Sequence, residues 1–305
     1  MSGNNSTTMP LVSIIMNCYN GEKYLEEAID SVLAQSYSNW ELVFWDNQSS
    51  DESAEIFKKY NDSRLKYFFA DAHTLLGEAR NKAVLKGKGD WIAFLDCDDL
   101  WVNTKLEKQL DLINSSKKLI GLVYTKTEYF CENSVVILPG NRESLPTGDI
   151  FLDLIQDNFI SLSSALINKK VFYELGTIDS TLNQAEEYNI FVKIAYKYPI
   201  LVSDEILTKY RIHDNNLSIS QKDLAFIESI KTLEIFKSDS RTIVGLNYWS
   251  SLFLLSSVVR MKISKDVILY FLKYGSVIKL INLGWRFFKY RFLKNDFINR
   301  YSNGK

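Results

Sequence analysis

Apolar and polar positions alternate along the first hundred residues in two distinct rhythms. Four short apolar runs have the length and composition of buried strands: residues 11–16, 41–45, 65–69 and 91–95. Three longer segments between them repeat apolar residues at helical spacing: residues 22–35, 51–60 and 78–86. Strands separated by helices of this length predict an α/β fold with a doubly wound, mostly parallel sheet.

Polar residues follow three of these strands at the point where each strand ends. They occupy segments 17–21, 46–50 and 96–99. Right-handed crossovers bring the carboxyl ends of parallel strands to one edge of a sheet, where open α/β proteins bind their ligands. We therefore expect three polar loops to meet in one crevice. Segment 77–81 opens a further helix, whose free backbone N–H groups and Arg80 suit phosphate oxygens, although a structural ion pair would also explain Arg80.

Carboxylates are concentrated in the loop after the fourth strand. Asp96, Asp98 and Asp99 follow a run that is apolar throughout, as expected of a strand covered on both faces. Carboxylates are hard oxygen ligands for Mg²⁺ or Mn²⁺, and such an ion offsets the charge of a diphosphate. Acidic residues also serve in turns and helix caps, but their clustering here favours a metal and phosphate site.

Composition places the chain among globular proteins with a sizeable core. Its 305 residues are 46% hydrophobic, enough for one large domain or for a domain with an appendage. Cys18, Cys97 and Cys131 have no CxxC spacing, so they indicate neither a disulfide framework nor a zinc site. A reducing, cytoplasmic compartment is expected. Residues 1–9 lack the pattern of a secretory signal and are expected to be flexible.

The net charge of −1 conceals an asymmetry along the chain. Residues 241–305 carry 12 Lys and Arg against 2 acidic residues, whereas residues 1–240 have a net charge of −11. Helical apolar patterning over 246–259 and 267–288 is interleaved with these basic residues. Two interpretations fit: helices that lie in the interface of an anionic membrane, or a helical subdomain packed on the rest of the protein. The apolar runs are interrupted too often to predict a membrane span.

Five segments taken together resemble family 2 glycosyltransferases with the GT-A fold. In order they are VSIIMNCYN (12–20), AIDSVLAQS (28–36), ELVFWDNQSSD (41–51), GEARNKA (77–83) and FLDCDD (94–99). Order and spacing match that family over residues 10–115, and weaker matches continue to about residue 218. The resemblance implies a nucleoside-diphosphate sugar donor, a divalent cation held through the Asp-x-Asp motif, and inversion at the anomeric carbon.

The loops after the first two strands supply the candidates for nucleoside binding. Asn17 and Tyr19 offer an amide and an aromatic face, which suit hydrogen bonding to a planar base and stacking on it. The resemblance places Tyr19 on the nucleobase and Asp46 with Asn47 on base or ribose. Many members have two aspartates where this chain has Asp46 and Asn47. An amide both donates and accepts, so the identity of the base stays open.

The resemblance also assigns the metal and phosphate region. Asp96 would lie near the ribose and the metal, Asp98 would be the principal ligand of Mn²⁺ or Mg²⁺ beneath the diphosphate, and Arg80 would neutralise charge there. The segment YRIH, ending at His213, resembles a family segment whose histidine reaches the metal or the diphosphate. His213 is therefore a further candidate ligand. The other histidine, His73, has no partner that the sequence identifies.

The catalytic base is expected in the second half of the chain. Residues 184–195 resemble the acidic segment that opens a helix in the family, with Glu187 at the position of the catalytic aspartate. Direct displacement with inversion needs a carboxylate that removes the proton of the acceptor hydroxyl. Glu187 is the expected base and Glu186 the alternative, although both also fit as first-turn acids favoured by the helix dipole.

The predicted function is inverting transfer of a sugar from a nucleoside-diphosphate donor to a saccharide or lipid-linked acceptor, in cell-envelope polysaccharide or glycolipid synthesis. Two other classes fit parts of the pattern. One is a non-catalytic nucleotide-sugar-binding or scaffold protein of the same fold, since Asn47 and Glu187 depart from the family. The other is a sugar-phosphate nucleotidyltransferase, although no glycine-rich loop follows the first strand. A nucleic-acid partner is not expected, since the basic tail lacks a reader motif.

The expected organisation has three parts: a flexible terminus (1–9), a GT-A domain (10–220) and a basic amphipathic helical region (221–305). Acceptor specificity is expected in the loops 130–148 and 158–164. The expected location is cytoplasmic, with residues 241–305 as the surface for peripheral contact with the inner face of an anionic membrane.

Overall fold

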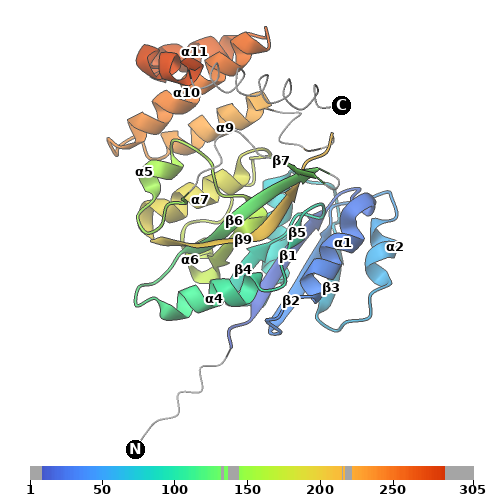
Figure 1. Ribbon diagram of the computed structural model, residues 1–305. Coiled ribbons are helices and arrows are strands. Elements are labelled where there is room, and N and C mark those ends of the chain that lie inside the picture. The colour runs from blue at the N-terminus through green and yellow to red at the C-terminus, as the bar shows by residue number, and fades with distance from the viewer. Residues whose placement is uncertain (1–8, 132–133, 137–143, 215, 217–221, 286–305) are drawn as a thin grey trace, which may run out of the picture.

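The protein is built on one nine-stranded sheet (Figure 1). The computed structural model describes residues 9–131, 134–136, 144–214, 216 and 222–285. In chain order the strands are β1 (Val12–Cys18), β2 (Trp40–Asp46), β3 (Leu65–Phe69), β4 (Trp91–Phe94), β5 (Leu100–Trp101), β6 (Leu122–Cys131), β7 (Ser134–Val136), β8 (Leu166–Asn168) and β9 (Ile200–Arg211). They lie in the order β3-β2-β1-β4-β8-β6-β9-β5, and β7 pairs with β6.

Helices connect these strands and continue beyond the last of them. They are α1 (Glu22–Leu33), α2 (Ser53–Lys58), α3 (Leu76–Lys86), α4 (Lys105–Ser115), α5 (Phe151–Leu154), the 3₁₀ helix η1 (Leu162–Ser164), α6 (Lys169–Glu174), α7 (Glu186–Lys197), α9 (Lys222–Glu234), α10 (Thr242–Val259) and α11 (Lys265–Tyr274). The helices predicted between the first four strands are therefore present, with ends that differ from the predicted bounds by a few residues.

Two hydrophobic cores lie on opposite faces of the sheet. Alternate side chains of β1 serve both, because successive residues of a strand point to opposite faces. Ile14 and Met16 pack with α1, α2 and α4, whereas Ile15 packs with α3, α6 and α7. The apolar stripe predicted on α1 forms part of the first core, where Leu25 and Ile29 are fully buried. Helices on both faces confirm the doubly wound α/β fold.

The strand directions divide the sheet into two parts. β3, β2, β1 and β4 are parallel neighbours, as the alternation of strands and helices predicts. β8 is antiparallel to both β4 and β6, and β5 is antiparallel to β9, whereas β6 and β9 are parallel. The second half therefore makes the sheet mixed, a feature that the sequence pattern did not reveal.

The helices after β9 share a core with the sheet domain. Leu233 of α9 and Phe253 of α10 are fully buried in the same cluster as Phe191 of α7. The packed-subdomain interpretation therefore holds for α9 and α10. The division proposed at residue 220 stays a prediction, and the hydrophobic core is continuous across that position.

The last helical stretch is broken. α11 ends at Tyr274, and the segment Val277–Trp285 continues at an angle of 114°. Among the described residues α10 is long and apolar enough to cross a membrane, with a mean hydropathy of 1.4, and the broken pair passes the same criterion as one unit. Because 39% of α10 is buried, it equally fits a core helix. The expectation that the chain has no membrane span stays a prediction, and residues 286–305 lie outside the described residues.

Candidate functional site

The polar loops after β1, β2 and β4 converge at one edge of the sheet. The Asn20 N–H donates to Ser49 Oγ at 3.1 Å, and Asn20 Oδ1 accepts from the Ser50 N–H at 2.9 Å. Gly21 packs against the third loop so closely that a Cβ there would lie 2.7 Å from Cys97 Sγ. Glycine is therefore required where the loops meet. The predicted convergence of the three loops is confirmed.

Two side chains near the end of β1, Tyr19 and Asn17, differ in exposure and in partners. The Tyr19 side chain is 55% exposed, and its ring centroid lies 4.3 Å from that of His73. Asn17 has a buried amide nitrogen and a buried amide oxygen, and neither has a hydrogen-bond partner among the described residues. The sequence had identified no partner for His73, whose Nδ1 lies 2.9 Å from the Asn47 carbonyl oxygen. The result is an aromatic face beside an unpaired amide.

Asp46 and Asn47 organise the loop after β2 from the inside. Asp46 is fully buried, and its carboxylate accepts hydrogen bonds from the Ser49 N–H and the Tyr67 hydroxyl, both at 2.7 Å. Asn47 Nδ2 donates to the Thr74 carbonyl at 2.9 Å, which ties this loop to the segment that carries His73. Both side chains are thus engaged within the protein, and their contact with base or ribose stays a prediction.

The Asp-x-Asp motif meets the segment after β9. His213 Nε2 lies 2.9 Å from Asp98 Oδ2, and both side chains are partly exposed. Asp99 is buried and accepts hydrogen bonds from Ser163 Oγ at 2.6 Å and from the Arg211 N–H at 3.0 Å. Asp99 therefore fastens the motif to the end of β9, and the side chains of Asp98 and His213 remain partly exposed.

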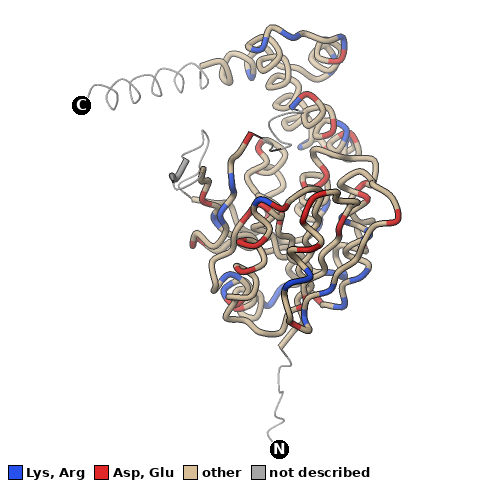
Figure 2. The backbone as a smooth tube through the Cα atoms, turned by 90° about the vertical axis from the view of Figure 1, so that its right-hand side faces the viewer, with Lys and Arg blue, Asp and Glu red and all other residues tan. Residues whose placement is uncertain are grey.

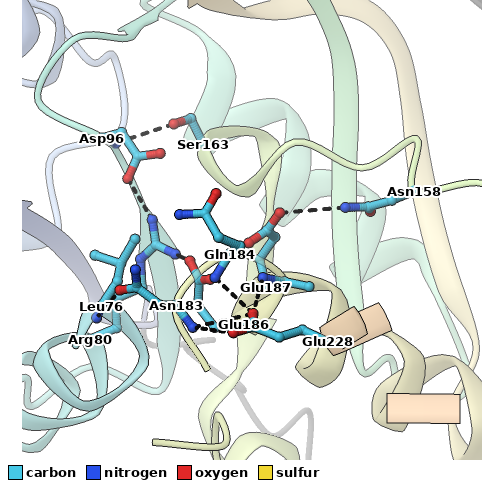
Figure 3. A network of polar contacts seen from close by, with 11 residues as sticks. Leu76, Arg80, Asp96, Asn158, Ser163, Asn183, Gln184, Glu186, Glu187 and Glu228 are labelled. Atoms are coloured by element: carbon cyan, nitrogen blue, oxygen red, sulfur yellow. Dashed lines mark hydrogen bonds and ion pairs between the residues drawn. The ribbon is translucent and has the colours of Figure 1, made fainter. Parts of the chain in front are cut away.

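A buried arginine connects the motif with α7 (Figure 3). Arg80 is 4% exposed; one guanidinium nitrogen lies 2.9 Å from Asp96 Oδ1, and another pairs with Glu186. Burial alone would lower the pKa of Arg80, but the charges of Glu186 and Asp96 outweigh it and raise that pKa. One cation thereby holds two carboxylates that are 90 residues apart in sequence.

The start of α3 corrects one expectation. The Leu76 N–H donates to Asn183 Oδ1 at 3.2 Å, and the Gly77 N–H donates to the Leu182 carbonyl at 3.3 Å. Within the predicted segment 77–81, the Gly77 N–H is therefore not free for phosphate, because the loop before α7 contacts the helix start. The ion-pair alternative for Arg80 is observed, and its action on the donor stays a prediction.

The two acids that open α7 have different surroundings. Glu186 is 2% exposed and is held by Arg80. Glu187 accepts one long hydrogen bond, from Asn158 Nδ2 at 3.4 Å. Burial raises the pKa of Glu187 well above its usual range, and the charge of Glu186 adds to the rise while Arg80 opposes it. A carboxylate whose pKa lies closer to neutrality is better suited to accept a proton during catalysis.

The residues expected to hold a metal fall into two groups. Asp98 and His213 lie together, whereas Asp96 is paired with Arg80. In the part of the chain that the structure describes, no group of three or more His, Cys, Asp or Glu side chains could hold a metal ion. The Asp98 carboxylate is a typical ligand of Mn²⁺ or Mg²⁺, the His213 imidazole is a less typical one, and diphosphate oxygens and water would supply the remaining ligands. The donor set therefore suits an ion that binds together with a diphosphate.

Known proteins that this chain resembles in sequence are described as glycosyltransferases. The model of the family described as glycosyl transferase family 2 matches residues 13–176. A Haemophilus influenzae protein named an uncharacterized glycosyltransferase is 34% identical over 263 residues, which cover 83% of this chain and 99% of the relative. A second uncharacterized glycosyltransferase, from Rickettsia typhi, is 32% identical over 212 residues. The match covers 68% of this chain and 66% of that relative. The Escherichia coli protein WfgD, named a UDP-Glc:alpha-D-GlcNAc-diphosphoundecaprenol beta-1,3-glucosyltransferase, is 40% identical over 68% of this chain and 79% of its own.

Solved structures agree on the fold. TarS of S. aureus, in complex with UDP-GlcNAc, superposes with a TM-score of 0.61 at 18% identity, over 87% of this chain and 73% of TarS. The mannosyltransferase PcManGT of Pyrobaculum calidifontis, in complex with GDP-Man and Mn²⁺, superposes with a TM-score of 0.64 at 15% identity. The superposition covers 91% of this chain and 79% of PcManGT. At these identities the likeness establishes the GT-A-like architecture alone.

Proposed function

The chain belongs to glycosyltransferase family 2, and from that premise we propose that it transfers a sugar, with inversion, from a nucleoside-diphosphate donor to a hydroxyl of a lipid-linked saccharide. The Arg80 network is the observation that carries the proposal. It joins Asp96, beside the proposed donor loops, to Glu186, next to the proposed base (Figure 3). One buried cation, Arg80, is therefore paired both with the proposed donor region and with the helix that carries the proposed base.

The nucleoside would bind at the end of β1. Tyr19 presents an exposed ring on which a base can stack, and His73 supports that ring from the side. The unpaired amide of Asn17 can donate to a base or ribose and accept from it. The name of WfgD includes the donor UDP-Glc, and the structure of TarS contains UDP-GlcNAc. A UDP-sugar is therefore the donor that we propose first.

The diphosphate would lie over Asp98 and His213. These two residues would hold Mn²⁺ or Mg²⁺, which when bound offsets the charge of the departing nucleoside diphosphate. Asp96 stays fixed by Arg80 at 2.9 Å, and Asp99 keeps the motif fastened to β9. Because their partners lie on several elements, these side chains need little rearrangement when the donor enters.

Glu187 would act as the general base on the acceptor hydroxyl. Its carboxylate faces the amide of Asn158, and Gln184 lies in the loop directly before α7 (Figure 3). Asn158 Oδ1 and Gln184 Nε2 are buried without hydrogen-bond partners among the described residues. Buried polar atoms are costly when unpaired. Saccharide hydroxyls, which both donate and accept, would satisfy them and would place one hydroxyl against Glu187.

The C-terminal helices would place the enzyme at an anionic membrane surface. Figure 2 shows Lys and Arg recurring along these helices. Between them, large apolar side chains are exposed: Leu269, Leu272, Val277, Ile278 and Trp285. An apolar face bordered by lysines fits the headgroup region of an anionic bilayer. Such docking suits a lipid-linked acceptor like the diphosphoundecaprenol substrate in the name of WfgD.

A donor and acceptor screen tests the proposal. Purified protein would be incubated with UDP-, GDP- and dTDP-sugars, Mn²⁺ or Mg²⁺, and a GlcNAc-diphosphate lipid; nucleoside diphosphate release and product mass are measured. Product with the opposite anomeric configuration to the donor supports the proposal. Donor binding without turnover would instead indicate the scaffold alternative. Pyrophosphate released from a nucleoside triphosphate and a sugar phosphate would indicate a nucleotidyltransferase.

A further inference from the structure

A carboxylate on α9 holds the loop that leads into α7 (Figure 3). Glu228 is 3% exposed, and its Oε2 accepts hydrogen bonds from the N–H groups of Gln184 and Ala185, both at 2.8 Å. The N–H of Asn183 donates to Glu228 Oε1 at 3.1 Å. Three consecutive backbone donors thus converge on one buried carboxylate, immediately before the helix that carries Glu186 and Glu187.

The start of α7 depends on a partner from elsewhere in the fold. The residue at its N-cap is Ala185, whose side chain cannot accept a hydrogen bond. Backbone N–H groups at a helix start lack partners within the helix and favour a negative charge nearby. Glu228 supplies an acceptor for one of these groups, the N–H of Ala185, and places a carboxylate beside the helix start. Charge-assisted hydrogen bonds of this kind are roughly twice as strong as neutral ones.

We propose that Glu228 is a positioning residue for transfer: it sets the place of Glu187 by fixing the loop 183–185. This inference rests on the proposed function, in which Glu187 is the base. The loop it fixes also reaches the donor side, because Asn183 Oδ1 accepts from the Leu76 N–H at 3.2 Å. One carboxylate therefore sets the start of α7, with Glu187, and supports the start of α3, with Arg80.

This placement makes the C-terminal helices part of the active site. Glu228 lies outside residues 13–176, the range of the family match. α9 is bonded to α7 a second time, through Asn189 Nδ2 and Thr232 Oγ1 at 3.2 Å. Catalysis should accordingly depend on α9 through Glu228, whatever the membrane contribution of α11.

The first test compares two substitutions on the same helix. Glu228→Gln keeps the shape of the side chain but removes its charge and replaces one acceptor by a donor. Glu234→Gln is the matched control, because Glu234 contacts Lys273 and Tyr274 at the other end of α9. We expect Glu228→Gln to lower kcat about 10–100-fold, because small displacements of a reacting group have effects of this size. Donor Kd should change by a much smaller factor than kcat, because among the described residues the loop 183–185 makes a single hydrogen bond with the start of α3. Glu234→Gln should leave both at wild-type values.

The second test asks whether Glu228 acts through Glu187. If it does, adding Glu228→Gln to Glu187→Gln should lower kcat further by less than about threefold. The effects of residues that act as a unit are not additive. Losses that multiply in the double variant would overturn the inference, as would wild-type kcat in Glu228→Gln. If Glu228→Gln does not fold by circular dichroism, Glu228→Asp, which keeps the charge on a shorter stem, takes its place under the same criteria. A wild-type protein that turns over no donor would refute the proposed function, whereas an active wild type with an unaffected Glu228 variant refutes this inference alone.

Discussion

His213 Nε2 lies 2.9 Å from Asp98 Oδ2, although 115 residues separate them in the chain. The fold explains the approach. β5 follows the Asp-x-Asp motif directly and pairs with β9 through Leu100 and Lys209. The Arg211 N–H then donates to Asp99, so the segment that carries His213 leaves β9 beside the motif. This pairing supports the proposed position of the metal and the diphosphate.

Removal of the Asp98 carboxylate should abolish transfer. Asp98→Asn keeps the size of the side chain but weakens a hard anionic ligand, so we expect loss of turnover with an unchanged melting temperature. EDTA should inactivate the wild type, and added Mn²⁺ should restore it. Asp111→Asn, on the exposed face of α4, is the control and should be fully active. Undiminished turnover in EDTA would contradict the metal assignment.

Glu187→Gln should lower transfer by ~10²–10⁴-fold, because an amide cannot accept the proton of the acceptor hydroxyl. Donor affinity, measured by calorimetry, should be retained. Glu186→Gln should act differently, since it weakens the pair with Arg80 and so affects folding as well. Normal transfer in Glu187→Gln together with an inactive, folded Glu186→Gln would exchange the two roles.

The pH dependence of kcat should report Glu187. A general base works when deprotonated, and burial raises the pKa of Glu187 above that of an exposed glutamate. Activity should therefore fall as the pH is lowered through this raised pKa, at a higher pH than for an ordinary carboxylate. The measurement is kcat at saturating donor and acceptor across the acid range. Residual activity of Glu187→Gln should lack this acid limb; if the limb persists, another group is responsible.

Arg80→Ala should destabilise the fold strongly. It would leave Glu186 buried without its cation, and breaking a buried pair costs about 3–5 kcal/mol in the free energy of unfolding. The control is Lys82→Ala on the same helix, whose pair with Glu78 is largely exposed and should contribute less than about 1 kcal/mol. Chemical denaturation of both variants gives the comparison. A loss in Arg80→Ala no larger than in Lys82→Ala would show that the network is energetically unimportant.

The C-terminal helices should bind anionic vesicles. We expect Lys262→Glu with Lys265→Glu to weaken co-sedimentation mainly at low salt, since both side chains are exposed. Leu269→Ser with Leu272→Ser should weaken it at all salt concentrations, because these side chains are 63% and 77% exposed and act by apolar burial. Charge reversal of Lys117 and Lys118 beyond α4 serves as the control. Wild-type protein that ignores anionic vesicles at low salt would contradict the membrane role.

Truncation after Ser240 is a poor substitute for these variants. It removes α10, whose Leu246 and Phe253 are buried in the main core. We expect the shortened chain to be insoluble, which would be seen as loss of the soluble protein peak in size-exclusion chromatography. Other basic residues of the region are less suitable for charge reversal, since Arg286 and Lys289 lie outside the described residues and Lys273 is paired with Glu234 at 2.8 Å.

The sequence by itself determined the layered part of this protein. Apolar periodicity is a local property, so it predicted the strands and helices of the first hundred residues and the polar loops at their ends. Because parallel strands gather their carboxyl ends, it also predicted that Asn20, Gly21 and Cys97 would lie in loops that meet. The resemblance to the family was likewise carried by short segments in a fixed order, which require no knowledge of distant contacts.

Only the tertiary structure decided how the polar side chains are partnered. The pairs Arg80 with Glu186, His213 with Asp98, and Glu228 with the loop before α7 join residues more than 40 positions apart. It also turned the predicted helix 267–288 into two segments and covered the start of α3. Charged groups in a sequence have many equally plausible partners. The fold selects among them, because burial penalises every carboxylate or guanidinium that does not meet its counterpart.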